Sequence, residues 1–187
     1  MGAAENTHMN RATDSFEKYT EVCRQIAVDR LASITGKKWE PVDVEEWDRL
    51  LFSSHIIMIT LAGKDLRVFL KVHYRPGRTK AVLENVKSKI TDVVSEYSNL
   101  LAGGVKQMLL DSGVLCGLSL PTLLTGIDEA ILSDVSKSHR FIDCFALQFS
   151  ETQIFVTIAT DVTSDIVKSS ILDCKYRGSD SDEIEFL

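Results

Sequence analysis

Residues 92–103 place two carboxylates, one amide and one glycine at a spacing that fits a single face of an α-helix. The segment reads DVVSEYSNLLAG, in which these residues are Asp92, Glu96, Asn99 and Gly103, here called the polar stripe. Because a helix turns by about 100° per residue, all four lie within about 60° of one another. The apolar residues around them fall on the opposite side: Ile90, Val93, Val94, Tyr97, Leu100, Leu101, Val105 and Met108. We therefore expect an amphipathic helix that buries its apolar face.

Two interpretations of the polar stripe stay open on the pattern alone. Exposed helix faces normally carry polar residues, so the stripe can be a solvated surface. However, Asn is a poor residue for the middle of a helix, and a glycine there costs about 1 kcal/mol relative to Ala. A helix that accepts both on one face indicates the close approach of a partner.

Other candidates for chemistry lack the spacing that their chemistry needs. Gly36-Lys37 is similar to the end of a phosphate-binding loop, but the first glycine of that motif falls on Leu31. No G-x-S-x-G segment is present. The four histidines and four cysteines show no metal-ligand spacing and no C-x-x-C pair, which indicates packing or surface roles.

Composition excludes several classes of function. The 187 residues suffice for one domain with a sizeable core, and 44% hydrophobic with 26% charged residues is typical of a soluble protein. A formal charge of −6 argues against nucleic acid or an anionic membrane as partner. No apolar run reaches the roughly 20 residues of a membrane span, and the N-terminus lacks the apolar stretch of a signal peptide. We expect a cytoplasmic protein.

Hydrophobic periodicity predicts alternating helices and strands around the stripe. Polar residues 13–15 offer a helix N-cap, and Gly36 and Gly113 offer helix ends. The expected helices are 16–31 and 79–112, the latter with a break near Ser88, and the expected strands are 54–61, 66–73, 114–120, 122–125, 141–149 and 153–159. This order predicts an α+β domain, with long helices packed on one face of an antiparallel sheet.

Three further expectations concern the rest of the chain. In strand 66–73, Val68, Leu70 and Val72 alternate with mostly polar residues, which predicts a sheet with one wet face. Residues 39–47 read as a loop, and 128–138 as a loop or short helix. We expect residues 1–12 to be a flexible extension, 13–174 the domain, and 175–187 an acidic tail.

The stripe and the segment after it resemble a known family. Asp92-x-x-x-Glu96-x-x-Asn99, with Pro121 some twenty residues later, is similar to the signature of the CheC/CheX/FliY phosphatases of bacterial chemotaxis. Residues 99–106, NLLAGGVK, resemble that family's helix, and residues 118–126, LSLPTLLTG, its following strand segment. The likeness is specific over 92–126 and covers about 15–160 in element order.

The resemblance implies a CheC-like fold and a function. The expected activity is removal of the phosphoryl group from the phospho-aspartate of a CheY-type receiver. Asn99 would orient the attacking water, Glu96 would pair with a receiver cation, and Asp92, Gly103 and Lys106 would take part in docking. No cofactor is expected in this chain, because the receiver would supply its own Mg²⁺.

The resemblance also implies a branch of the family. The CheC branch carries the signature twice, whereas here Arg24 stands where the first helix would need its Asn. A single site is similar to the CheX branch and implies a homodimer with strands paired across the interface. Two alternatives remain open: a non-catalytic receiver-binding module related to flagellar switch proteins, and a structural dimerisation domain with a solvated stripe.

Overall fold

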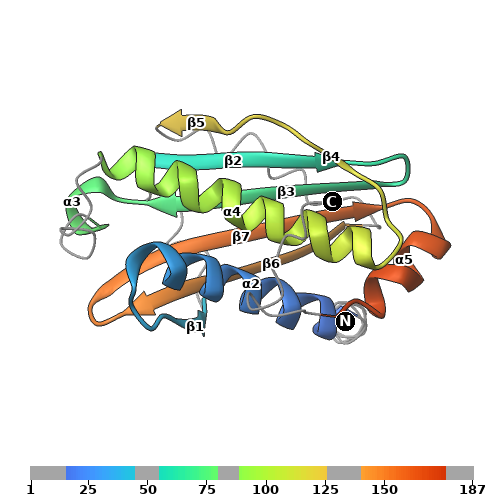
Figure 1. Cartoon of the computed structure of the whole chain (residues 1–187), viewed down its shortest axis with the longest axis horizontal. Helices are drawn as coiled ribbons and strands as arrows, with labels where there is room; N and C mark the ends of the chain where they lie inside the picture. Colours follow the sequence, from blue (N-terminus) through green and yellow to red (C-terminus); the bar gives the residue numbers. More distant parts are fainter. Residues whose placement is uncertain (1–15, 45–54, 80–88, 126–139, 176–187) are drawn as a thin grey trace, which may run out of the picture.

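The computed structural model describes residues 16–44, 55–79, 89–125 and 140–175. Figure 1 shows one sheet with helices in front of it. The helices are α2 (Glu17–Thr35), α3 (Pro76–Thr79), α4 (Ile90–Asp111) and α5 (Asp165–Leu172). The strands are β1 (Glu40–Asp43), β2 (His55–Ala62), β3 (Leu66–Tyr74), β4 (Gly117–Leu118), β5 (Thr122–Thr125), β6 (Arg140–Phe149) and β7 (Thr152–Val162).

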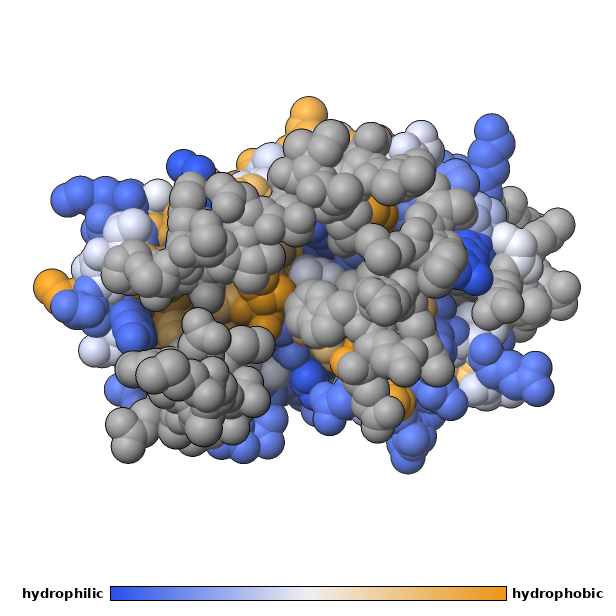
Figure 2. Space-filling model, turned by 180° about the vertical axis from the view of Figure 1, so that it is seen from behind, coloured by the Kyte–Doolittle hydropathy of each residue, from blue (hydrophilic) through white to orange (hydrophobic). Residues whose placement is uncertain are grey.

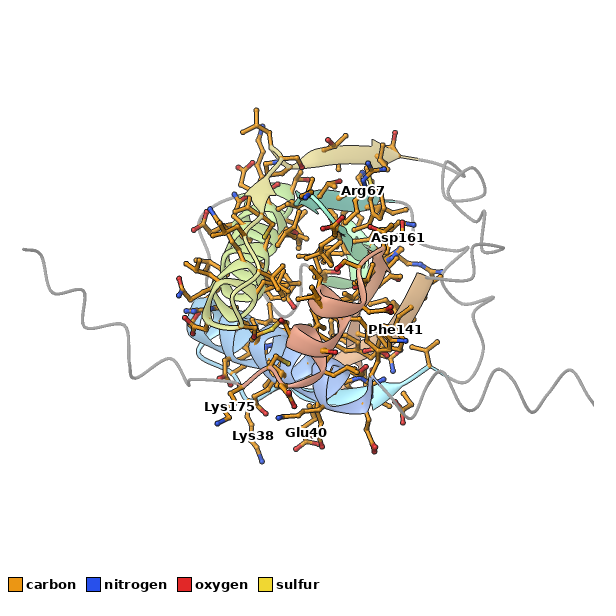
Figure 3. All side chains as sticks on the ribbon, turned by 90° about the vertical axis from the view of Figure 1, so that its right-hand side faces the viewer. Lys38, Glu40, Arg67, Phe141, Asp161 and Lys175 are labelled. Atoms are coloured by element: carbon orange, nitrogen blue, oxygen red, sulfur yellow. The ribbon has the colours of Figure 1, made fainter. Side chains whose placement is uncertain are left out.

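The sheet is antiparallel throughout its described pairs. Its order is β1-β6-β7-β3-β2-β4, and β5 also pairs with β2. Seen end on, α2 and α4 lie on the same side of the sheet (Figure 3). The predicted α+β class, with long helices packed on one face of an antiparallel sheet, is therefore confirmed.

The core lies between this helix layer and the facing side of the sheet. Alternate residues of β3 enter it, so that Leu66, Val68, Leu70 and Val72 are all buried. The apolar side of α4 supplies the other half of the contact, with Leu101 and other residues fully buried there. Burial of these side chains holds the helix on the sheet and turns its polar side outward.

A glycine permits the close packing of α2 on α4. A Cβ built on Gly104 would stand 2.6 Å from Cγ2 of Ile26, closer than real side chains approach. Nearby, Tyr97 donates a hydrogen bond of 3.2 Å from its hydroxyl to the carbonyl oxygen of Ala27. The two helices are thus fixed against each other at the level of the polar stripe.

Most predicted elements are found with small changes at their ends, but the strand expected at 114–120 is reduced to the two residues of β4. The hairpin of β2 and β3 turns at residues 63–65, and Gly36 ends α2 in the left-handed conformation with φ of 64°. The helix that carries the stripe begins at Ile90 and ends at Asp111. Residues 80–88, including the expected break, lie outside the described residues, as do 1–15, 126–139 and 176–187.

Two expectations on local structure were wrong, and one helix was not predicted. Residues 40–43 form β1, which pairs with β6, and the neighbouring Trp39 is buried in the core. Phe16, and not a polar residue of 13–15, precedes the first helix, and it stacks on Phe141 at 4.8 Å between ring centroids. Finally, α5 was not predicted: it is only eight residues long, DIVKSSIL, and buries only Ile171.

The expectation of one wet sheet face holds at the exposed Arg67 but was wrong for the second half of β3. Lys71 is 9% exposed and His73 is fully buried, although both lie on the side away from the core. A hydrogen bond of 3.0 Å joins Nε2 of His73 to Oγ1 of Thr157 on β7. This face also carries hydrophobic surface, visible in Figure 2. Alternation detects polar side chains, but a polar side chain with a partner can be buried.

The Ser-Leu-Pro segment forms a bulge at the sheet edge. Between the pairs Leu61–Leu118 and Met58–Thr122, three residues on this segment oppose two on β2. Ser119 closes the gap, since its hydroxyl accepts a hydrogen bond of 2.9 Å from the backbone N–H of Thr60. Pro121 follows where no N–H is needed, and Leu120 is left 85% exposed.

Candidate functional site

The polar stripe lies on the outer face of α4, away from the sheet. Asp92, Glu96, Asn99 and Gly103 are all exposed, whereas Val93, Val94, Tyr97 and Leu101 of the same helix are buried. The wheel drawn from the sequence is therefore correct for this helix, with Leu100 only half-buried. The stripe is accessible to a partner along its whole length within the described part of the chain.

The charged and amide side chains of the stripe are not used to hold the fold. Within the described residues, no side-chain hydrogen bond or ion pair engages Asp92, Glu96 or Asn99. Other polar residues of α4 do have internal partners: the hydroxyl of Ser98 donates to the carbonyl oxygen of Val94 at 2.8 Å. As far as the described segments are concerned, Asp92, Glu96 and Asn99 thus keep their hydrogen-bonding groups for solvent or a ligand.

The charge of Asp92 affects the pKa of one buried group, the hydroxyl of Tyr74. The pKa of Tyr74 is raised above its ordinary value, first by burial and further by the Asp92 carboxylate, while a hydrogen bond to Thr91 opposes the shift. Tyr74 ends β3, and its hydroxyl donates to Oγ1 of Thr91 at 3.2 Å. This contact fixes the first turn of α4 on the sheet and so positions the start of the stripe.

Gly103 leaves open space on the helix surface. A Cβ built there would meet no heavy atom within 4 Å, in contrast to the neighbouring Gly104. Nothing within the described residues therefore requires a glycine at 103 for packing. Because glycine weakens a helix interior, its presence fits the approach of an external backbone or side chain.

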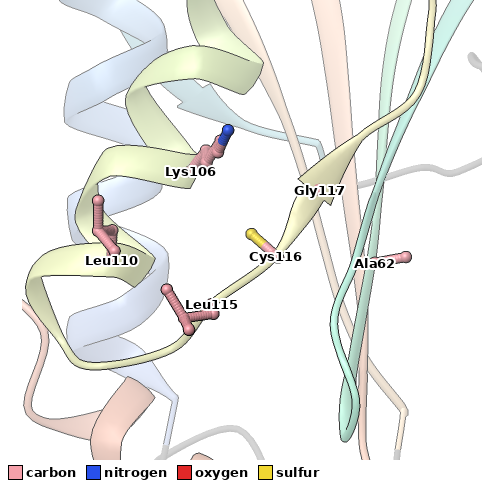
Figure 4. A pocket seen from close by; sticks show the side chains of 6 residues that line it. All are labelled: Ala62, Lys106, Leu110, Leu115, Cys116 and Gly117. Atoms are coloured by element: carbon pink, nitrogen blue, oxygen red, sulfur yellow. The ribbon is translucent and has the colours of Figure 1, made fainter.

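A depression opens beside the C-terminal half of α4. It has a volume of about 440 Å³ and is lined by Ala62, Lys106, Leu110, Leu115, Cys116 and Gly117 (Figure 4). Lys106 is close enough to the thiol of Cys116 to oppose the rise of its pKa that burial causes. Since Lys106 lies three residues after Gly103 on α4, the depression borders the stripe directly.

The segment that lines one side of the depression, residues 115–117, depends on a glycine in the β2–β3 turn. A Cβ built on Gly63 would stand 2.6 Å from the carbonyl oxygen of Leu115. Only glycine lets the turn and the segment after α4 approach so closely. This contact fixes the path of residues 115–117 along the sheet edge.

The structure brings the predicted site residues together and adds a feature that sequence reasoning missed. Asp92, Glu96, Asn99, Gly103 and Lys106 line one face of one helix. The depression was not foreseen, because it depends on how residues 115–117 return beside α4. Its only sequence signal is a set of leucines, Leu110, Leu115, Leu118 and Leu120, between the helix and Pro121.

The described residues contain neither a metal-binding cluster nor a membrane-spanning helix. No group of three or more His, Cys, Asp or Glu side chains there is placed to hold a metal ion. In the same residues, no helix is both long and apolar enough to span a membrane.

Solved structures with the same fold include proteins of bacterial chemotaxis. The chemotaxis protein CheX from Vibrio vulnificus matches with a TM-score of 0.59 and 16% identity, over 77% of this chain and 99% of that one. A chain of the CheX-CheY-BeF3-Mg²⁺ complex from Borrelia burgdorferi matches with a TM-score of 0.54 and 12% identity, over 78% and 98%. A chain of the FliM-SpeE complex from H. pylori matches with a TM-score of 0.53 and 8% identity, over 84% and 94%.

Comparisons based on sequence add nothing to this result. No protein-family model matches the chain, and no curated protein matches it either. The structural likeness shows that the chain has the CheX/CheC-like fold that its signature implied.

Proposed function

We propose that the protein is a cytoplasmic phosphatase that hydrolyses the phospho-aspartate of a CheY-type receiver. The observation that carries the proposal is the pair Glu96 and Asn99. Both are exposed, unengaged by the described residues and one helical turn apart on α4. The fold supports it, because one structural neighbour is a chain from a complex of CheX with CheY.

The proposed reaction asks little of this chain except positioning. A water oxygen attacks phosphorus in line, the acyl oxygen–phosphorus bond breaks, and the aspartate carboxylate of the receiver leaves with the bonding electrons. Both hydrogens of the water stay with the phosphoryl group, one of them after transfer to a phosphoryl oxygen, so that the second product is inorganic phosphate, H2PO4⁻. The receiver's Mg²⁺ neutralises the phosphoryl oxygens. Fixing the water in a near-attack geometry removes a large entropic part of the barrier.

An amide suits this task better than a carboxylate. The Asn99 side chain is neutral, so the phosphoryl group does not repel it, and it can accept a hydrogen bond from the water and donate one to an oxygen. Its exposure on a rigid helix lets it enter a receiver site. No nucleophile or metal ligand from this chain is used in the proposed step.

The rest of the stripe sets the docking position. In the proposal Glu96 pairs with a cation of the receiver, which a carboxylate can accept through a charge-assisted hydrogen bond. Asp92 contacts the receiver at the first residue of the stripe, and Lys106 contacts it just beyond the last. Gly103 lets the backbone of the receiver approach α4. The four stripe residues are exposed on this helix face, and Lys106 on the same face is half-buried.

The structure explains why α2 is not proposed as a second site. Arg24 turns into the fold, where it forms two hydrogen bonds with the buried Asp143, of 3.0 and 2.8 Å, and one of 2.6 Å with Asp43. Its guanidinium also lies 5.1 Å from the centre of the Phe145 ring. Arg24 therefore joins α2 to β6 and β1 and is not available for catalysis.

A homodimer is part of the proposal, and the two described sheet edges differ in how well they could pair. At one edge, β1 carries Pro41 between the acidic residues Glu40 and Asp43, which opposes strand pairing. At the other, β5 has the uncharged sequence TLLT. We therefore place the dimer contact at β5, and sedimentation of the purified chain at increasing concentration tests it.

The alternative is a receiver-binding module without catalysis. A chain of a FliM-SpeE complex shares the fold, so the fold alone does not decide between binding and hydrolysis. The two functions separate in one experiment on Glu96→Ala and Asn99→Ala. A phosphatase loses turnover in Asn99→Ala while it still binds a receiver loaded with BeF3⁻ and Mg²⁺, and Glu96→Ala loses affinity for that receiver.

Glu21→Ala is the matched control, since Glu21 is an exposed carboxylate on α2. We expect this variant to match the wild type in both binding and turnover. Binding without any acceleration of phosphate loss by the wild type would replace the phosphatase with the binding module.

A further inference from the structure

The outer face of α4 continues beyond the polar stripe and changes character. Asn99, Gly103, Lys106 and Leu110 follow one another at spacings of four, three and four residues, so they lie on one face of the helix. Leu110 occupies the last turn and is 44% exposed. The same face is thus polar as far as Lys106 and ends on an exposed apolar side chain in the last turn.

Further exposed leucines stand next to Leu110. Leu115 is 76% exposed in the segment after the helix, and Leu118 on β4 is 43% exposed. Leu118 pairs with Leu61, whose side chain is buried in the core on the helix side of the sheet. Directly paired residues share a face, so Leu118 lies on the side of the sheet that carries α4. We call Leu110, Leu115 and Leu118 the leucine flank.

Two residues of the leucine flank border a space that can receive a side chain, and Leu118 follows directly after Gly117, which also lines it. Leu110 and Leu115 line the depression of about 440 Å³, together with Cys116 and the stem of Lys106 (Figure 4). Residues 115–120 carry no charge, in contrast to the acidic residues of the β1 edge. Exposed apolar groups gathered around a hollow, with a charged group at the rim, are typical of interaction sites.

We propose that the leucine flank is a second contact for the same receiver, and that it takes a bulky apolar side chain of that protein. This inference rests on the proposed function. The choice of occupant follows from continuity, because Lys106 borders both the stripe and the depression. A helix rises 1.5 Å per residue, so Leu110 lies only about 16 Å along the axis from Asn99. A single interface of roughly 800 Å² per partner covers both.

The two contacts should affect different kinetic constants. Polar groups on the stripe exchange water for receiver groups, which contributes modestly to affinity. Apolar burial in the depression supplies affinity that is the same before and during the reaction, and such uniform binding lowers KM without changing kcat. The leucine flank should therefore control KM, and Asn99 should control kcat.

The test is made with Leu115→Ser, Leu118→Ser and the double variant. Affinity is measured by calorimetry for a CheY-type receiver loaded with BeF3⁻ and Mg²⁺, and KM and kcat are measured with the phosphorylated receiver. We expect a loss of affinity and a rise in KM of at least tenfold in the double variant, with kcat within twofold of the wild type. Leu115→Met should keep most of the affinity that Leu115→Ser loses, because the Met side chain still fills the depression with an apolar group.

Ile166→Ser is the matched control. Ile166 is 81% exposed on α5 and does not line the depression, so its replacement removes a similarly exposed apolar side chain outside the leucine flank. It should leave affinity and KM unchanged. Circular dichroism and the midpoint of urea unfolding show that all variants fold.

The outcomes separate this inference from the proposed function. If the wild type binds the loaded receiver without hydrolysis, and the serine variants lose that binding, the docking surface stands and the phosphatase is refuted. If the wild type is a phosphatase whose KM and affinity the serine variants retain, the docking surface is refuted. A serine variant that loses only self-association assigns the leucine flank to a second copy of the chain, and this too overturns the inference.

Discussion

Two adjacent glycines of α4 should respond to the same substitution in opposite ways. Gly103 faces open space, whereas a Cβ on Gly104 would stand 2.6 Å from Cγ2 of Ile26. Replacing either glycine by Ala in a helix interior gains about 1 kcal/mol of helix propensity. For Gly103→Ala nothing opposes this gain, so the free energy of unfolding should rise by about 1 kcal/mol.

Gly104→Ala should instead lose stability. Ile26 lies in α2, and its side chain is β-branched. Such a side chain has one strongly preferred rotamer in a helix, so its Cγ2 cannot easily turn away from the new methyl group. Overpacking of a core contact costs about 1–3 kcal/mol. After the propensity gain, the variant should be less stable than the wild type, by up to about 2 kcal/mol.

Urea unfolding followed by circular dichroism measures this difference, and the decay of phosphorylated receiver measures function. Gly103→Ala, although more stable, should dock the receiver less well, by roughly tenfold or about 1.4 kcal/mol, because its methyl group stands where the receiver approaches. Gly103→Gln should be worse still. Full docking by both Gly103 variants would refute the close approach, and equal stability gains at both positions would refute the packing argument.

Three further variants test the parts of the fold that position the site. Arg24→Ala should lower the free energy of unfolding by about 2–3 kcal/mol in urea, because it leaves the buried Asp143 without its paired guanidinium; a change below 0.5 kcal/mol would contradict this. Burial, with a smaller contribution from Lys71, lowers the pKa of His73 from 6.5 to about 3, so the unfolded chain binds more protons between these values. Stability should be fully present above pH 6.5 and fall toward pH 3 by up to about 1.4 kcal/mol per unit, and a His73→Gln variant with the same slope would refute it. Ser119→Ala removes the acceptor for the Thr60 N–H and should loosen the bulge, seen as faster amide exchange at Thr60; unchanged exchange would contradict that role.

The helix with the stripe could be predicted from the sequence because one period governs it. Apolar residues on one side and polar residues on the other settle both its existence and its exposed face. The hairpin of β2 and β3 was equally accessible, since alternation and a turn with Gly63 mark it. These elements carry every residue proposed for the stripe.

The features that sequence reasoning missed depend on contacts between distant segments. Strand β1 is four residues long, fully exposed and recognisable only through its pairing with β6. The burial of His73 requires Thr157, which is 84 residues away. The depression exists because Gly63 admits the backbone of Leu115. None of these contacts leaves a periodic pattern in the local sequence.

The most direct measurement is the decay of a phosphorylated CheY-type receiver in Mg²⁺, followed alone, with the protein, and with its Asn99→Ala variant. We predict that the protein accelerates the decay and that the variant, folded and still able to bind the BeF3⁻-loaded receiver, does not. Acceleration by Asn99→Ala equal to that of the wild type would contradict the role of the polar stripe in hydrolysis.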